Sequence, residues 1–318
     1  MNLSLFIVIS LLSVILTYGY KTLWNLSSLK ETTATGYGLL LIILLFSYSL
    51  FFNELNIDTT VLFFILFFSL IYWYDDIKYL SSNFRFFLQF ISGFTIATVL
   101  LLHYGYILNF YFLSIIIISG LINIFFSNVV NFYDGLDLNI STFSIILGIT
   151  FIFLLDDKVI QNYYGIIIIG FIVGFSYFNI KPNNIFFGDS GCFILACLIN
   201  FIIVKSFLIS NITIVFLLIP LSLPIIDVLY VLVLRIYMNE SLLSRNYHHL
   251  YHKLGSKYQK KYYLIPQILN SIILYILSNI FIKIDSIDQN LINIFIISSI
   301  ILTFFLYLFI RNFYKLND

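Results

Sequence analysis

The sequence predicts an all-α, polytopic integral membrane protein with about eleven transmembrane helices, and three observations carry this prediction. Of the 318 residues, 61% are hydrophobic and only 10% are charged, and the mean hydropathy is +1.03. A soluble domain carries about 25% charged residues. The apolar residues form eleven runs that reach or approach the roughly 20 residues needed to cross a bilayer. No polar stretch between them is long enough for a separate soluble domain, so residues 1–318 are expected to form one transmembrane domain.

The apolar runs follow one another along the whole chain. They are Leu3–Tyr20, Gly38–Phe52, Thr60–Tyr74, Phe86–His103, Ile107–Phe126, Ile140–Leu155, Tyr163–Phe178, Gly191–Val204, Ile212–Tyr237, Tyr263–Ile282 and Leu291–Ile310. The first run lacks a basic start and a small-residue cleavage site, so we interpret it as a retained span rather than a signal peptide. The ninth run contains Pro220 and Pro224, which are expected to kink or break its helix.

The charges of the loops predict the orientation. If the loop from Lys21 to Tyr37 is cytoplasmic and the loops then alternate, thirteen of the sixteen Lys and Arg residues lie on the cytoplasmic side. The exceptions are Lys158, Lys205 and Lys283, in outer loops that carry only plain charges. This positive-inside bias predicts an N-terminus outside and a C-terminus in the cytoplasm. The net charge of +1 does not indicate nucleic-acid binding.

A polar segment after the fifth run is the strongest functional signal. Asn128, Asn131 and Asp134 recur every three residues and Asp137 continues the series, so on a helix their side chains form one stripe. Such a stripe beside a membrane-length apolar run is costly unless it binds something. The alternative is a solvated loop between two helices. Amide and carboxylate oxygens suit Mg²⁺ or Mn²⁺, which also share the phosphate oxygens of substrates.

Two further acidic positions lie on the predicted cytoplasmic side. Asp75 and Asp76 end the third run, and adjacent carboxylates that repel each other suit a general base or a metal site. The alternative is a helix end that faces water. Asp189 lies between glycines at the start of the eighth run, where free N–H groups favour phosphate. Asp189 would repel phosphate unless a metal lies between them; the alternative role is a helix cap.

Basic residues supply the opposite charge on the same side. The segment from Arg245 to Lys253 includes His249 and His252, and this cluster suits a diphosphate. Since no Cys is near, it does not resemble a zinc site; the alternative is an ordinary basic loop. Lys30, in the first inner loop, is a further candidate phosphate contact.

Together these features predict Mg²⁺-assisted transfer of a phosphorylated group from a soluble polyanionic donor to a membrane lipid. The alternative from another class is a multi-span transporter or lipid flippase. A transporter is expected to place ionisable groups near the midplane, where only Asp227 is a candidate. The concentration of acids on one membrane face therefore favours the transferase.

The motifs resemble those of the polyprenyl-phosphate N-acetylhexosamine-1-phosphate transferases (glycosyltransferase family 4). Asn-x-x-Asn-x-x-Asp-Gly-x-Asp, ending at Asp137, is the most specific match. The double Asp at residues 75–76, Gly-Asp-Ser-Gly at 188–191, Pro-x-x-Asp ending at Asp227 and the His-Leu-Tyr-His segment at 249–252 follow in the family's order. The segment at 249–252 has Tyr251 where the family has a His, which keeps an inactive relative as a third hypothesis. The absence of three adjacent His favours an initiating enzyme of O-antigen or capsule synthesis.

The resemblance implies a role for each matched residue. Asp75 and Asp76 would be catalytic, Asn131 and Asp189 would hold Mg²⁺ (with Mn²⁺ as the alternative), and the substrate would contact Lys30, Asp134, Asp137, Arg245, His249 and His252. The implied reaction joins UDP-N-acetylhexosamine and undecaprenyl phosphate and releases UMP. The implied location is the bacterial cytoplasmic membrane, which the chain crosses several times and on whose cytoplasmic face the active site lies. The lipid bilayer is the implied partner, and a homodimer is a possible assembly.

Overall fold

The computed structural model describes residues 3–27, 33–52, 56–107, 109–153, 163–180, 185–209, 221–241, 247–258, 261–282 and 289–316. All regular elements within these ranges are helical, which confirms the predicted all-α class. The helices are α1 (Leu3–Leu26), α2 (Leu39–Phe52), α3 (Ile57–Ile77), α4 (Ser82–His103), α5 (Phe110–Tyr133), α6 (Asn139–Phe153), α7 (Gly165–Asn179), α8 (Gly188–Ile209), α10 (Ser222–Tyr237), α11 (Leu250–Tyr258), α12 (Ile265–Ile282) and α13 (Gln289–Phe313). A short 3₁₀ helix at Lys261–Leu264 precedes α12.

Each predicted apolar run overlaps one of these helices, although residues 212–220 of the ninth run lie outside the described residues. Helix α11 is an additional short helix in the His-containing segment. Several helix starts have a local cause. The side chains of Asn56, Ser81 and Asn109 accept hydrogen bonds from backbone N–H groups in the first turns of α3, α4 and α5. Such N-caps satisfy donors that have no partner within a helix.

The lengths and compositions of the helices define a multi-pass membrane protein. Seven helices in the described part of the chain are long and apolar enough to cross a membrane, and α2, α6 and α7 are shorter apolar helices. Large apolar side chains of α1 and α13, among them Leu11, Ile15, Ile294 and Phe305, are exposed. A soluble protein rarely exposes so much apolar surface.

The predicted interruption near the prolines coincides with a helix start. α10 begins at Ser222, so Pro224 lies in its first turn, where a proline is tolerated because the N–H groups there have no helical partner. Pro220 lies outside the described residues.

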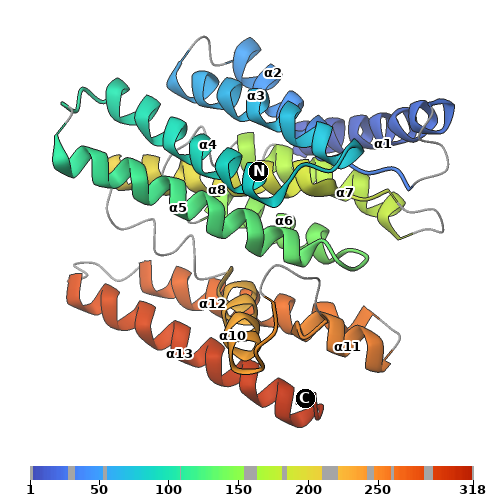
Figure 1. The fold of residues 1–318 in the computed structure, drawn as a ribbon, viewed down its shortest axis with the longest axis vertical. Helices are drawn as coiled ribbons and strands as arrows, with labels where there is room; N and C mark the ends of the chain where they lie inside the picture. The colour runs from blue at the N-terminus through green and yellow to red at the C-terminus, as the bar shows by residue number, and fades with distance from the viewer. Residues whose placement is uncertain are drawn as a thin grey trace.

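Helix α8 is the centre of the fold. It packs against α2, α3, α4 and α5, and 83% of the residues in its most apolar 18-residue stretch are buried. Figure 1 shows α1 to α8 as one group of helices, with α10 to α13 as a second group beside α5 and α6. The contact between α5 and α10 joins the two groups.

A buried ion pair links α3 and α8 at the end of the bundle away from Asp75. Lys205 Nζ donates to both carboxylate oxygens of Asp58 at 2.9 Å, and both side chains are almost fully buried. The expectation that Lys205 is a plain charge of an outer loop was therefore wrong. Lys205 and Asp58 both lie within helices. In the low dielectric of the protein interior, either charge would be strongly destabilising without the other.

Candidate functional site

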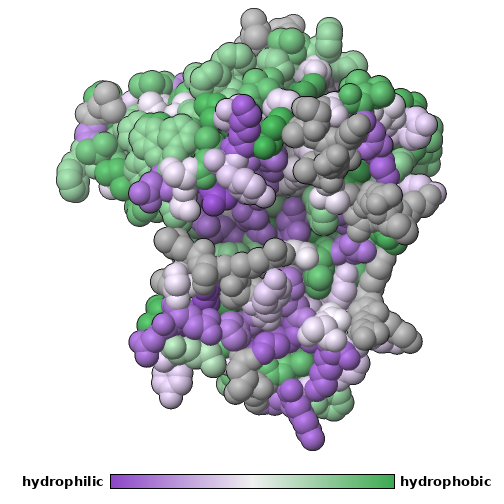
Figure 2. Space-filling view, turned by 45° about the vertical axis from the view of Figure 1, so that its right-hand side comes forward, coloured by the Kyte–Doolittle hydropathy of each residue, from purple (hydrophilic) through white to green (hydrophobic). Residues whose placement is uncertain are grey.

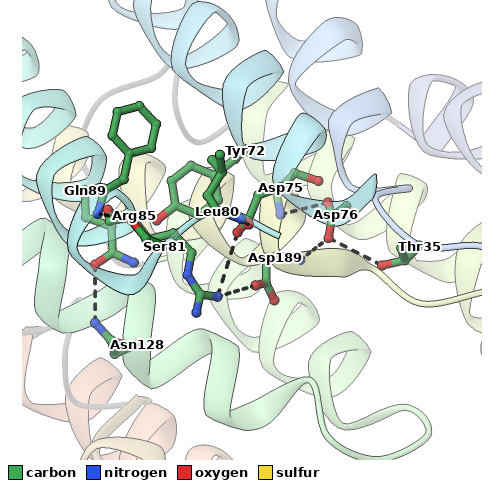
Figure 3. A network of polar contacts seen from close by, with 12 residues as sticks. Thr35, Tyr72, Asp75, Asp76, Leu80, Ser81, Arg85, Gln89, Asn128 and Asp189 are labelled. Atoms are coloured by element: carbon green, nitrogen blue, oxygen red, sulfur yellow. Dashed lines mark hydrogen bonds and ion pairs between the residues drawn. The ribbon is translucent and has the colours of Figure 1, made fainter. Parts of the chain in front are cut away.

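Three helix ends meet at one end of the bundle. α3 ends just after Asp76, α5 ends just before Asp134, and α8 begins at Gly188. Because α3 and α5 both pack against α8, these helix ends lie together, although Asp76 and Gly188 are more than 100 residues apart in the sequence. The structure therefore brings together the acidic motifs that the sequence placed on one side of the membrane. Figure 3 shows the contacts of Asp75, Asp76 and Asp189.

Asp76 binds the beginning of α8. Its Oδ1 accepts the N–H of Asp189 at 2.8 Å, and its Oδ2 accepts the N–H of Ser190 at 3.2 Å. The hydroxyl of Thr35 adds a longer contact to Oδ1 at 3.4 Å (Figure 3). The carboxylate of Asp76 thus occupies the N-terminus of α8, where free N–H groups and the helix dipole favour negative charge.

Asp75 has a different environment from its neighbour. It is only 2% exposed, and its Oδ1 accepts the N–H of Leu80 at 2.5 Å. Its Oδ2 is buried with no hydrogen-bond partner among the described residues and lies 3.8 Å from Nη1 of Arg85. A buried carboxylate oxygen without a donor is costly, so this atom is available to a ligand. The two adjacent acids therefore have separate partners.

Arg85 connects Asp75 with Asp189. Its Nη1 donates to Asp189 Oδ2 at 3.1 Å while it lies within ion-pair distance of Asp75 (Figure 3). The side chain of Asp189 also forms a hydrogen bond with Asn131. Arg85 follows the double Asp in sequence and is a possible charge partner for it, but it was not among the predicted catalytic, substrate or metal residues. The sequence indicates Arg85 only by its position, nine residues after Asp76 and in the first turn of the next helix, α4.

The loop before α2 closes one side of the site. The N–H of Phe186 donates to the carbonyl of Ala34, and the N–H of Gly38 donates to the carbonyl of Phe187, both at 2.9 Å. Gly188 has φ +87°, and a Cβ there would lie 2.4 Å from the backbone nitrogen of Gly36. Only glycine fits this approach. Lys30, which the sequence analysis selected in this loop, lies outside the described residues.

The turn after α5 carries the remaining acids. The N–H of Gly188 donates to Asp134 Oδ2 at 3.2 Å. Burial raises the pKa of the Asp134 carboxyl well above its ordinary value; the Gly188 hydrogen bond opposes this shift, and the charges of Asp189 and Asp76 add to it. The backbone carbonyl of Asp137 accepts the hydroxyl of Tyr263 at 2.7 Å, which joins this turn to the start of α12.

The His-containing segment packs against the same turn. The ring of His249 lies 5.2 Å from the ring of Phe132, which follows Asn131 in sequence. A Cβ on Gly135 would lie 3.1 Å from Nε2 of His252, so that ring covers the glycine of the motif. The structure thus places two predicted phosphate ligands beside the acidic turn. Arg245 lies outside the described residues.

The oxygen atoms of the site fit a hard cation. Asn131 and Asp189 supply an amide and a carboxylate, and Asp75 adds the carboxylate oxygen that has no hydrogen bond among the described residues. Within the described ranges, no three His, Cys, Asp or Glu side chains form a metal site by themselves. Amide and carboxylate oxygens are ligands that Mg²⁺ can accept, and Mg²⁺ usually keeps several waters and shares phosphate oxygens with its substrate.

Hydrophilic residues also gather at this end of the molecule. Figure 2 shows apolar residues over most of the upper group of helices and hydrophilic residues where the two groups meet. Fold and site together define a multi-pass membrane protein whose polar site is built from the ends of its helices.

The sequence profile of glycosyl transferase family 4 matches residues 59–207. This segment extends from the first turn of α3 nearly to the end of α8 and contains Asp75, Asp76, the Asn131–Asp137 turn and Asp189. Within this segment, which is just under half of the chain, the protein is similar to glycosyl transferase family 4.

One relative adds to this result. The phospho-N-acetylmuramoyl-pentapeptide-transferase of Latilactobacillus sakei subsp. sakei (strain 23K) is 35% identical over 89 residues. The match covers 27% of this chain and 27% of that relative, so the chain spans about a quarter of the relative's length. Asp227 and the His-containing segment lie outside the part matched by the family profile.

Proposed function

We propose that the protein transfers N-acetylhexosamine-1-phosphate from a UDP-sugar to undecaprenyl phosphate. The products are undecaprenyl-diphospho-N-acetylhexosamine and UMP. One observation carries the proposal: Asp75, Asp76 and Asp189 converge at one end of a bundle of membrane helices, with Arg85 between two of them. A site at the ends of such helices would be reached by a soluble nucleotide from water and by a phospholipid-like acceptor from the bilayer.

The proposed orientation follows from the charges of the loops. With thirteen of the sixteen Lys and Arg residues on the cytoplasmic side, the acidic site faces the cytoplasm, where nucleotide sugars are made. The proposed location is the cytoplasmic membrane of a bacterium. The proposed role is the initiating step of a cell-surface polysaccharide such as an O-antigen or capsule. A homodimer is compatible with this assignment.

The residues of the site have different roles in the proposed reaction. Asn131 and Asp189 would hold Mg²⁺, which neutralises charge on the transferred and departing phosphates. His249 and His252 would contact the diphosphate, and Asp137 would bind the uracil. Asp76 keeps the start of α8 in place through the N–H groups of Asp189 and Ser190, while Asp75 keeps one oxygen for the acceptor phosphate or its proton.

A transfer assay tests the proposal. Membranes that contain the protein are incubated with undecaprenyl phosphate, Mg²⁺ and a panel of UDP-sugars labelled in the sugar, and label is then counted in the butanol-extractable lipid. We expect label in the lipid with at least one UDP-N-acetylhexosamine, together with release of UMP. Facilitated movement of lipid across vesicles without transfer of label would instead support the transporter hypothesis.

The transfer is expected to depend on a divalent cation. The acidic groups of the site cannot approach a diphosphate without a counter-charge, so excess EDTA should reduce transfer to background and Mg²⁺ or Mn²⁺ should restore it. The measurement is the same lipid extraction before and after addition of the metal. Full turnover in excess EDTA would contradict the proposed metal site.

A further inference from the structure

Asp227 lies at the centre of a buried polar network that joins α10, α11 and α13. The residue is fully buried. Its Oδ1 accepts the N–H of Leu250 and the hydroxyl of Tyr307, both at 2.9 Å, and its Oδ2 lies 3.0 Å from Nδ1 of His249. Arg311 donates to the hydroxyl of Tyr307 at 3.0 Å and so helps to position the group that binds Asp227. Buried carboxylates are costly unless they are paired and fully hydrogen-bonded, and this network meets that demand.

The contact between Asp227 and His249 determines where the ring carries its hydrogen. An ionised carboxylate only accepts hydrogen bonds, so the Nδ1 of His249 must donate to it. The other oxygen of Asp227, Oδ1, already accepts hydrogen bonds from two donors. The neutral ring then has a bare Nε2, and this nitrogen is the one that binds a further proton.

The Nε2 of His249 is buried and has no hydrogen-bond partner among the described residues. The residue is only 2% exposed. Its ring packs against Phe132 at 5.2 Å and Tyr251 at 5.5 Å, so it lies directly beside the last turn of α5, which carries Asn131 and leads to Asp134. A buried nitrogen without a partner at this place is costly unless a ligand supplies one.

We propose that Asp227 is a positioning residue that holds the hydrogen of His249 on Nδ1 and reserves Nε2 for a phosphate oxygen of the substrate. When Nε2 takes up a proton, Asp227 stabilises the resulting imidazolium, and the Nε2–H donates to the phosphate. The same arrangement of carboxylate and ring orients His ligands in metal and catalytic sites. The identity of the phosphate rests on the proposed function, whereas the role of Asp227 toward the ring does not.

The Asp227→Asn variant separates this role from a structural one. Asparagine keeps an oxygen for Leu250 and Tyr307, and its amide nitrogen replaces the oxygen that faces His249. All three hydrogen bonds are kept, but the amide donates to Nδ1, so the neutral ring must carry its hydrogen on Nε2. The imidazolium also loses its counter-charge. The fold is therefore expected to persist while the chemistry of the ring changes.

Nitrogen-15 NMR of His-labelled protein in bilayers reports the tautomer directly. The chain has only four His residues, and the His249→Gln variant assigns the signal by its loss. In the ligand-free wild type we expect the hydrogen on Nδ1, and in Asp227→Asn we expect it on Nε2. Addition of Mg²⁺ and inorganic pyrophosphate should shift the Nε2 signal of the wild type toward its protonated position. A wild-type ring with its hydrogen on Nε2, or an unchanged tautomer in Asp227→Asn, would overturn the proposal.

Turnover provides the second readout. We expect Asp227→Asn to lower kcat by about 10- to 100-fold, the usual effect of losing such a partner, with little change in the unfolding temperature. Tyr307→Phe is the matched control, since it removes one hydrogen bond to Asp227 but leaves the carboxylate facing His249. It should keep the wild-type tautomer and lose less activity. If the wild type transfers no sugar with any donor, the proposed function fails, while the ligand-free tautomer still tests Asp227.

Discussion

Replacing Asp189 with alanine is expected to reduce transfer by more than about 100-fold, to the background of the assay, while the protein still inserts into the membrane. The Asp189 carboxylate accepts a hydrogen bond from Arg85 at 3.1 Å and contacts Asn131. Its loss would remove one of the two proposed ligands of Mg²⁺ and leave Arg85 without this anion. The measurement is labelled sugar-1-phosphate in butanol-extractable lipid, normalised to the amount of protein in the membrane.

The matched control is Asp156→Ala, which removes an acidic residue that the charge pattern assigns to an outer loop. This variant should keep at least about half of the activity, because the charge pattern assigns Asp156 to the membrane face opposite the acidic site. Undiminished transfer by Asp189→Ala would refute the assignment of Asp189 to the metal and, with it, the proposed arrangement of the site.

Replacing Asp76 with asparagine is also expected to abolish transfer. The two carboxylate oxygens accept the N–H groups of Asp189 and Ser190 at 2.8 and 3.2 Å. The asparagine amide can keep only one of these bonds and places a donor against the other N–H. The start of α8 should therefore shift, and Asp189 would shift with it. A displacement near 1 Å in a catalytic group can cost about 100-fold in rate.

The same substitution should also lower stability slightly. Loss of a negative charge at a helix N-terminus costs about 0.3–1 kcal/mol, which thermal unfolding in detergent would detect as a modest shift. Thr35→Ala serves as the control, since it removes only the 3.4 Å contact to the same carboxylate and should keep activity within about threefold. Activity of Asp76→Asn equal to that of Thr35→Ala would exclude an essential role for the Asp76 charge.

Part of the acidic site can be predicted from the sequence alone. The regular spacing of Asn131 and Asp134 and the glycines around Asp189 marked residues that the structure brings together. Asn128, from the same series, instead donates to Gln89 and to the carbonyl of Ile124. Their roles in catalysis remain predictions. Lys30 and Arg245, which lie outside the described residues, also remain predictions.

Other features of the site had no sequence signal of their own. Asp75 and Asp76 are identical neighbours, yet one contacts Arg85 and the other binds the N-terminus of α8. Asp227 was considered as an ionisable group within a membrane span, as a transporter would have. The structure instead pairs it with His249, because α10, α11 and α13 pack against each other.

The sequence by itself determined the class of the protein and the position of most helices, because the bilayer requires long apolar runs and each run is a local property of the chain. It also located the polar residues that such runs do not tolerate without a function. Only the tertiary structure decided which of these residues share a partner. Contacts such as Arg85 with Asp189 and Tyr307 with Asp227 join residues 104 and 80 positions apart, and the packing of helices, rather than local spacing, brings them together.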